Sequence, residues 1–431
     1  MLFHRTLASI WCFGSAVSSW QHTFTAGGFT DCDQPCFTTD VSAYQTVKGP
    51  VWMSTSPRDH MTRSLLSAVN GSSWEQWYFD MVSSKADESL MMCVSRDASY
   101  TMMGQGVLRI EFFVMLANGT ILGGPEFVDQ SRVEDCCGHV RGVWKGPDRW
   151  YAFTISRDLS HIEGNFERPG IRGRFVLDAI TPGRYADGST WPSTTANHEV
   201  SPMLRIAEPM SAGRAKLELI LDGEEPRVIE GLGGHNRFWS SKDWFSLVSK
   251  WNVGRATVGP YHITIWEDVS KLDGKKYQGS MLFKNGEPLV RASGVLLPNT
   301  SESTPQTDHL LMSRRYGGDI HSNWGDKSTG WTLDFVSPSR GQRWTFELEH
   351  KTRPFEVGLG ENRGLAGYTE VVSGGEVGGE QFDLGYGWTE LVDLPQTFSL
   401  KLMIGVWWQM ASSGNLLLFM WKMVSAPLRS G

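Results

Sequence analysis

The sequence predicts an all-β protein built from two tandem barrels or sandwiches. Short segments rich in β-branched and aromatic residues recur along the chain, and Gly, Pro and Ser turns separate them. Only Ser240–Lys250 has the pattern of a helix. At 431 residues the chain is long enough for two such units of about 200 residues each. We therefore expect two β domains joined near the middle of the chain.

The expected strands follow one another with few interruptions. Lys216 to Leu219 alternate between polar and apolar residues, which is typical of a strand with one face in water. Asn285-Gly286 stands between two strand-like runs and predicts a tight hairpin. The expected strands in the first half are 72–84, 106–116, 149–159, 174–180 and 215–223. Those in the second half are 261–269, 280–297 (the hairpin), 330–338, 343–359, 366–374 and 386–395.

The composition divides the chain into five parts. Residues 1–18 have a basic Arg5, a mostly apolar run and small residues at 16–18, which is the pattern of a secretory signal peptide; a plain N-terminal strand or helix is the alternative. Residues 19–60 form a polar, turn-rich N-terminal arm. The first β domain is expected over 61–225 and the second over 226–395. Residues 396–431 form an atypical apolar tail, which we expect to pack on a barrel, or to be an artefact of gene-model translation, rather than to anchor the chain in a membrane.

Charge and motifs exclude several function classes. The net charge is −7 and no dense Lys/Arg cluster occurs, so a nucleic-acid or anionic-membrane partner is not expected. The sequence contains no His-Glu-x-x-His, no G-x-S-x-G, no G-x-G-x-x-G and no Walker lysine pattern. These absences lead us to expect no metal and no cofactor.

The cysteines and sequons agree with secretion. Removal of the signal would leave Cys32, Cys36, Cys93, Cys136 and Cys137, so at most two disulfides form and one thiol stays free. Adjacent cysteines pair poorly with each other, so Cys136 and Cys137 are expected to reach other parts of the first half. Candidate glycosylation sites are Asn70, Asn118 and Asn299.

The stretch from Gly231 to Trp266 concentrates glycines, tryptophans, histidines and arginines. Apolar walls with a few polar groups are what a small-molecule pocket needs. Aromatic packing that seals a domain junction explains the same composition. The residues alone leave both interpretations open.

At SSWEQWYFD (72–80), Gly231–Trp239, Trp251–Arg255 and Gly259–Tyr261 the sequence resembles the two-domain, lipocalin-like proteins that include carotenoid 1,2-hydratase relatives and fungal Diels–Alderases. The resemblance extends in texture from about residue 70 to 395. It implies two lipocalin-like barrels with a ligand pocket at or near their interface, and terpenoid or polyketide small molecules as substrates. Asn236-Arg237 stands where many relatives have an extra His or Asp pair, which disfavours a hydratase.

The expected activity is a cofactor-independent [4+2] cycloaddition. With its signal peptide, sequons and disulfides, the chain is similar to the subgroup that joins a tropolone o-quinone methide to a sesquiterpene such as humulene. The alternatives are a decalin-forming Diels–Alderase acting on a polyketide polyene, and a secreted carrier without catalysis. Such catalysis needs stacking walls and a donor aimed at a carbonyl. The expected donors are Arg255, His235 and Tyr261, and the expected walls are Trp77, Trp239, Trp251, Trp266 and Tyr368.

Overall fold

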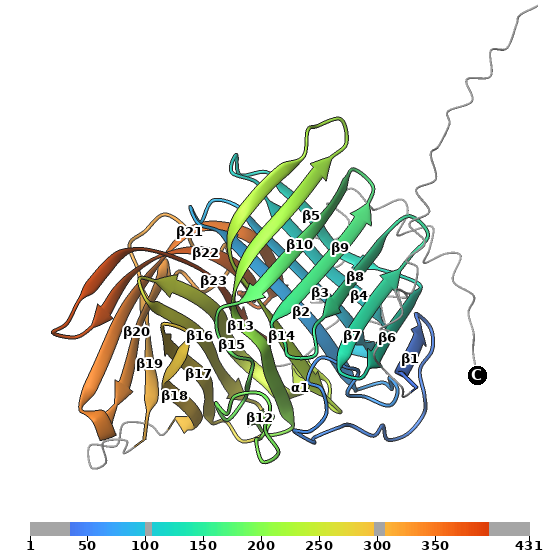
Figure 1. Cartoon of the computed structure of the whole chain (residues 1–431), viewed down its shortest axis with the longest axis horizontal. Helices are drawn as coiled ribbons and strands as arrows, with labels where there is room; N and C mark the ends of the chain where they lie inside the picture. The colour runs from blue at the N-terminus through green and yellow to red at the C-terminus, as the bar shows by residue number, and fades with distance from the viewer. Residues whose placement is uncertain (1–34, 100–105, 297–306, 396–431) are drawn as a thin grey trace, which may run out of the picture.

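A computed structural model describes residues 35–99, 106–296 and 307–395. The predicted signal peptide, the apolar tail, Cys32 and Asn299 lie outside the described residues. Within them, the structure is almost entirely antiparallel β, as the sequence predicts, and it forms two curled sheets that lie against each other (Figure 1). No helix among the described residues has the length and apolar character needed to cross a membrane.

The first sheet has 14 strands and occupies the blue-to-green half of the chain. Its main order is β1-β6-β7-β8-β9-β10-β13-β14-β2-β3-β4-β5, and β11 and β12 add to β13. Its strands are β1 (Phe37–Ser42), β2 (Trp74–Ser83), β3 (Ser89–Asp97), β4 (Leu108–Met115), β5 (Ile121–Phe127), β6 (Gln130–Cys136), β7 (His139–Lys145), β8 (Trp150–Ile155), β9 (His161–Arg168), β10 (Ile171–Ala179), β11 (Arg184–Tyr185), β12 (Glu199–Ser201), β13 (Leu204–Leu221) and β14 (Arg227–Ser240).

The second sheet has nine strands in the order β18-β17-β16-β15-β23-β22-β21-β20-β19. The hairpin predicted at Asn285-Gly286 joins β17 to β18, and both turn residues have positive φ, as a type I′ turn requires. The strands are β15 (Val248–Val258), β16 (Tyr261–Ser270), β17 (Lys276–Lys284), β18 (Glu287–Leu296), β19 (His309–Arg315), β20 (Gly330–Ser337), β21 (Gln342–Gly360), β22 (Arg363–Glu376) and β23 (Gln381–Asp393), with the 3₁₀ turn η2 (Pro338–Arg340) before β21.

The passage from one sheet to the other lies later in the chain than the sequence predicts. β14 follows the expected boundary at 225/226, yet it pairs with β13 on one side and β2 on the other. It therefore belongs to the first sheet, and the second begins at β15. The predicted helix at 240–250 is only the four-residue α1 (Trp244–Leu247), capped by the Asp243 side chain, because Val248–Lys250 already belong to β15.

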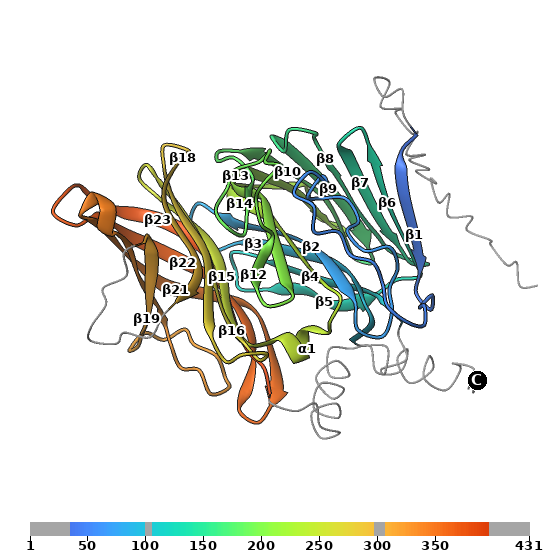
Figure 2. The same ribbon diagram turned by 90° about the horizontal axis from the view of Figure 1, so that it is seen from below.

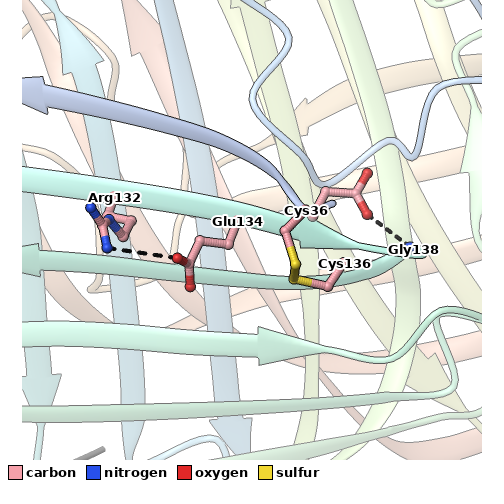
Figure 3. The surroundings of a disulfide bond; sticks show 6 residues. Cys36, Arg132, Glu134, Cys136 and Gly138 are labelled. Atoms are coloured by element: carbon pink, nitrogen blue, oxygen red, sulfur yellow. Dashed lines mark hydrogen bonds and ion pairs between the residues drawn. A yellow bond between two sulfur atoms is a disulfide. The ribbon is translucent and has the colours of Figure 1, made fainter. Parts of the chain in front are cut away.

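The N-terminal arm is also more regular than expected. Its residues 37–42 form β1, which pairs with β6. A disulfide joins Cys36, just before β1, to Cys136 at the end of β6 (Figure 3). Cys137 is disulfide-bonded too, and Cys93 is a buried free thiol, which confirms that one thiol stays free among the described cysteines.

Three buried apolar clusters hold this arrangement. One lies inside the curled first sheet and one inside the second. The third lies between the sheets and contains residues of both. Figure 2 shows the two sheets side by side with α1 at their junction. The third cluster is therefore where a shared pocket has to be sought.

Candidate functional site

A pocket opens within the cluster between the two sheets. Its cavity volume is about 50 Å³. Strands β2, β3, β4, β5 and β14 of the first sheet supply one wall, and β15, β16, β21, β22 and β23 of the second supply the other. Its aromatic walls are Trp74, Trp244, Trp251, Trp266, Phe238 and Phe355. The structure thus places a pocket at the interface, where the resemblance implied one.

Strand alternation decides which residues of β2 reach the pocket. Successive side chains of a strand point to opposite faces, so Trp74, Gln76 and Tyr78 share one face and all three line the pocket. Trp77 and Phe79 point the other way, into the core of the first sheet. The same alternation on β14 sends Phe238 to the pocket and the residues on either side of it into the first core.

A chain of hydrogen bonds crosses the pocket wall. Trp388 donates its indole N–H to the Tyr78 hydroxyl over 2.9 Å. Tyr78 is in turn hydrogen-bonded to Glu390, and the Trp251 indole N–H points at the Glu390 Oε1 over 3.4 Å. Tyr78 comes from the first sheet and the others from the second, so this chain exists only when the sheets are docked.

Two titratable groups of the pocket lining, Glu390 and Tyr78, are protonated at neutral pH. Burial, followed by the charge of Glu111, raises the pKa of Glu390 to about 8. Burial, followed by the charges of Glu390 and Asp80, raises the pKa of Tyr78 well above its usual value. At neutral pH both groups therefore hold a proton, and a protonated carboxyl in an apolar site is a hydrogen-bond donor.

Trp244 of α1 adds a donor that the protein does not use. Its side chain is buried, and its indole N–H has no hydrogen-bond partner in the described part of the chain. A buried unpaired donor is costly, so it needs an explanation. A polar atom of a bound ligand would provide the missing acceptor.

Arg255, a predicted donor, lies outside the pocket lining. It extends from β15 into the first sheet and donates through Nε to both oxygens of Asp80, at 2.8 and 3.0 Å. Its other N–H groups donate to the carbonyl oxygens of Met210 and Ser211 and to the Asn236 side chain. These partners occupy both terminal nitrogens as well as Nε, so the structure gives Arg255 the role of joining the sheets.

Glycine at 234 makes room for this arginine. A Cβ at that position would overlap the Arg255 guanidinium. A glycine is required because the side chain of one sheet passes directly over the backbone of the other. The glycine-rich stretch therefore serves the junction between the sheets, one of the two roles that its composition allowed.

Three further predicted residues lie in the core of the first sheet. His235 stacks on Phe79, and burial lowers its pKa well below the usual value, so it stays neutral. Trp77 donates its N–H to the Thr62 carbonyl, and Trp239 donates to that of Ser54. None of the three lines the pocket, because all project from the inner faces of their strands.

Tyr261 and Tyr368 lie in the core of the second sheet. Tyr261 packs edge-on against Phe346, and Tyr368 stacks on His350 at 3.8 Å between ring centroids. Both side chains are buried away from the pocket. Of the residues predicted for the site, Trp251 and Trp266 are the two that the structure brings into it.

Comparison with known proteins identifies the family. Residues 33–395 match the model of a family described as "DA-like: Diels-Alderase-like". The chain belongs to the Diels–Alderase-like family. It is accordingly an enzyme, a cyclase of the pericyclase type, and enzymes of this family act on small molecules.

Relatives of this Diels–Alderase-like chain cover most of its length. It is 36% identical over 370 residues to "Diels-Alderase mycB" of Thermothelomyces thermophilus, covering 84% of this chain and 82% of the relative. It is 34% identical over 401 residues to "Hexane cyclase pydB" of an Acremonium species, covering 92% and 91%. The crystal structure of CghA with Sch210972 matches the fold with a TM-score of 0.73 at 21% identity, covering 84% of this chain and all of CghA.

The pocket between the sheets also contains residues that the sequence analysis does not single out. Tyr78, Trp74 and Gln76 lie in the segment that carried the resemblance, where only Trp77 was selected. Glu390 lies in the predicted closing strand, and Trp244 lies in the predicted helix. Alternation along β2 was the available signal, because it separates Trp77 from the other three.

Proposed function

We propose that this Diels–Alderase-like enzyme closes a six-membered ring within one polyene substrate by a [4+2] cycloaddition. The observation that carries the proposal is an aromatic pocket shared by both sheets, with protonated Tyr78 on the first sheet and protonated Glu390 on the second. The names of two relatives, a Diels–Alderase and a hexane cyclase, support ring closure.

The pocket supplies what such a reaction requires. The indole and phenyl walls hold a flexible polyene folded, and preorganisation of this kind contributes up to about 7–11 kcal/mol in the best-oriented cases. A donor on the carbonyl of the dienophile withdraws electron density and stabilises the charge that develops in the transition state. Glu390 and the unpartnered Trp244 N–H are the donors in reach of the pocket.

The test is a rate comparison with a linear polyene that carries a conjugated carbonyl dienophile. We expect the purified enzyme to accelerate cyclisation and to favour one stereoisomer over the mixture formed in buffer. A rate and product ratio equal to those in buffer would show that the protein is a carrier instead. A parallel incubation with a tropolone quinone-methide precursor and humulene tests the intermolecular hetero-Diels–Alder reaction, and a product formed only there would replace our proposal.

We also propose that the chain enters the secretory pathway. The Cys36–Cys136 disulfide and the disulfide-bonded Cys137 support this, because structural disulfides persist in oxidising compartments. Expression of the full chain in a fungal host, followed by localisation of the protein, tests it. Recovery of a reduced protein from the cytosol alone would contradict it.

A further inference from the structure

A second cavity opens at one end of the first sheet, and it shares no lining residue with the pocket between the sheets. Its volume is about 800 Å³. The turn after β6, the turn after β8 and the loop 58–63 surround it, and the half-buried Trp191 lies at its edge. The proposed reaction uses none of these groups, so the cavity needs an occupant of another kind.

A covalent bond joins the wall of this cavity to the N-terminal part of the chain. Cys137 lines the cavity and is disulfide-bonded. The other three described cysteines are a disulfide pair and a free thiol, so none of them is its partner. The remaining cysteines of the sequence are Cys12 and Cys32, and both precede the described residues.

The reach of the chain selects Cys32 as the partner. Figure 3 shows Cys36 bonded to Cys136, where β1 begins and β6 ends. Cys32 is only four residues before Cys36, and four residues span at most about 14 Å. It therefore stays within reach of Cys137, the residue that follows Cys136. Cys12 lies much further back, in the predicted signal peptide.

The cavity presents two exposed arginines that form no ion pair within the described part of the chain, Arg58 and Arg157. Arg157 lies over the turn next to Cys137, because a Cβ at Gly138 would be 2.8 Å from the Arg157 Cγ. A segment bonded to Cys137 would thus run directly past a guanidinium.

The aspartates of the cavity already have partners. Asp59 pairs with Arg63 over 2.8 Å, and Asp135 accepts the Gly138 N–H over 2.8 Å. Asp158 accepts hydrogen bonds from serines of its own turn. The two unpaired arginines are therefore the groups that a further carboxylate would neutralise.

The sequence supplies such carboxylates at the required place, because Asp31 and Asp33 flank Cys32. We propose that residues 31–34 lie across this cavity as a strap, with Cys32 bonded to Cys137 and the two aspartates against the unpaired arginines. The bond forms by exchange with an oxidised dithiol oxidoreductase, which takes up the two electrons and two protons of the thiols. The strap is independent of the proposed cyclisation.

Thiol mapping on the purified full chain tests the covalent part. N-Ethylmaleimide under denaturing, non-reducing conditions labels free thiols, and mass spectrometry locates the label. In the unaltered protein we expect label on Cys93 and none on Cys137. Cys32→Ser should expose Cys137 to the label, whereas Cys12→Ser, the matched control, should not.

Arginine labelling tests the charged contacts without disturbing the disulfides. The double variant Asp31→Asn/Asp33→Asn removes both charges and keeps the size of the side chains. We expect phenylglyoxal to modify Arg157 about threefold faster in this variant, the value of one exposed ion pair. Asp222→Asn/Asp383→Asn changes two exposed aspartates outside the cavity and should leave the rate unchanged.

Each contrary outcome has a definite meaning. If Cys137 stays blocked in Cys32→Ser, the strap is wrong: the partner is Cys12, or a second copy of the chain if a reducible dimer appears on a non-reducing gel. Equal modification of Arg157 in both double variants would also overturn the strap, and this test remains available if Cys32→Ser does not fold. Failure of the cyclisation assay with both strap results as expected would overturn the proposed function and leave the strap standing.

Discussion

Two regions of the same interface are built in opposite ways. Around Arg255 the junction between the sheets is polar and satisfied: an ion pair with Asp80, two carbonyl acceptors and an amide oxygen. In the pocket the interface is aromatic, and it contains the neutral carboxyl of Glu390 and the Trp244 indole N–H, which has no partner among the described residues. Groups whose hydrogen bonds are all made within the protein hold the two sheets together, whereas a donor without a partner remains available to a ligand.

The largest effect on stability is expected from breaking the polar junction around Arg255. Arg255→Met leaves the Asp80 carboxylate buried without its partner, which costs about 3–5 kcal/mol of unfolding free energy. Denaturant unfolding followed by fluorescence measures the loss. Arg132→Met, which breaks an ion pair exposed by more than half, should cost less than about 1 kcal/mol. Equal losses in the two variants would contradict the structural role of Arg255.

Two tryptophan variants test the aromatic pocket: one in its lining and one in the core of the first sheet. Trp244→Phe removes the unpartnered N–H, so kcat/KM should fall about tenfold, the value of one hydrogen bond, with little change in Tm. Trp77→Phe leaves the Thr62 carbonyl without its donor, so stability should fall by about 1–3 kcal/mol with kcat/KM nearly unchanged. If Trp77→Phe lowered kcat/KM and Trp244→Phe lowered only stability, the substrate would bind on the opposite face of β2, and not in the pocket between the sheets.

The neutral carboxyl predicts a pH dependence. Glu390 keeps its proton below pH 8 and loses it above, so kcat should decline as pH rises through about 8. Because its pKa is raised from 4.5 in the unfolded chain, its ionisation also lowers stability as pH rises from about 4.5 to about 8. Glu390→Gln should flatten both profiles, measured by cyclisation rate and by thermal melting. An alkaline decline that persists in this variant would assign it to another group.

The smallest effect concerns two sequons, which also differ in how many hydrogen bonds the asparagine side chain makes. The Asn70 amide donates to the Gly49 carbonyl and accepts bonds from Ser72 and Ser73. Asn118 is exposed in the turn after β4 and accepts one bond from Thr120. In a secreted preparation, Asn118→Gln should remove one glycan and leave Tm unchanged, as mass spectrometry and melting would show. A glycan on Asn70 in the folded protein would be inconsistent with its hydrogen bonds.

The fold was largely predictable because strand patterns and turns are local. The hairpin at Asn285-Gly286 and the runs that became β2, β16, β20 and β23 carry their own signals. The boundary was misplaced because β14 pairs with β2, about 150 residues earlier in the chain, and such pairing leaves no trace in a single sequence.

The site was predictable only in part, for the same reason. Trp251 and Trp266, which line the pocket, stand out in the sequence because they lie in a dense aromatic stretch. The ion pair of Arg255 cannot be read from the sequence because its partner Asp80 is 175 positions away. Glu390 resembled an ordinary strand residue, and only burial against the other sheet makes it a neutral acid.

Within the described residues the chain crosses between the sheets once, through residues 241–247, and that crossing contains Trp244, a wall of the pocket. The tether and the binding surface are therefore the same few residues. Separation of the two halves would take the pocket apart, because its lining comes from both, so ligand binding and the docking of the halves are linked. Neither half contains a complete pocket by itself. A functional chimera of two relatives would therefore have to keep residues 241–247 together with the halves that they join.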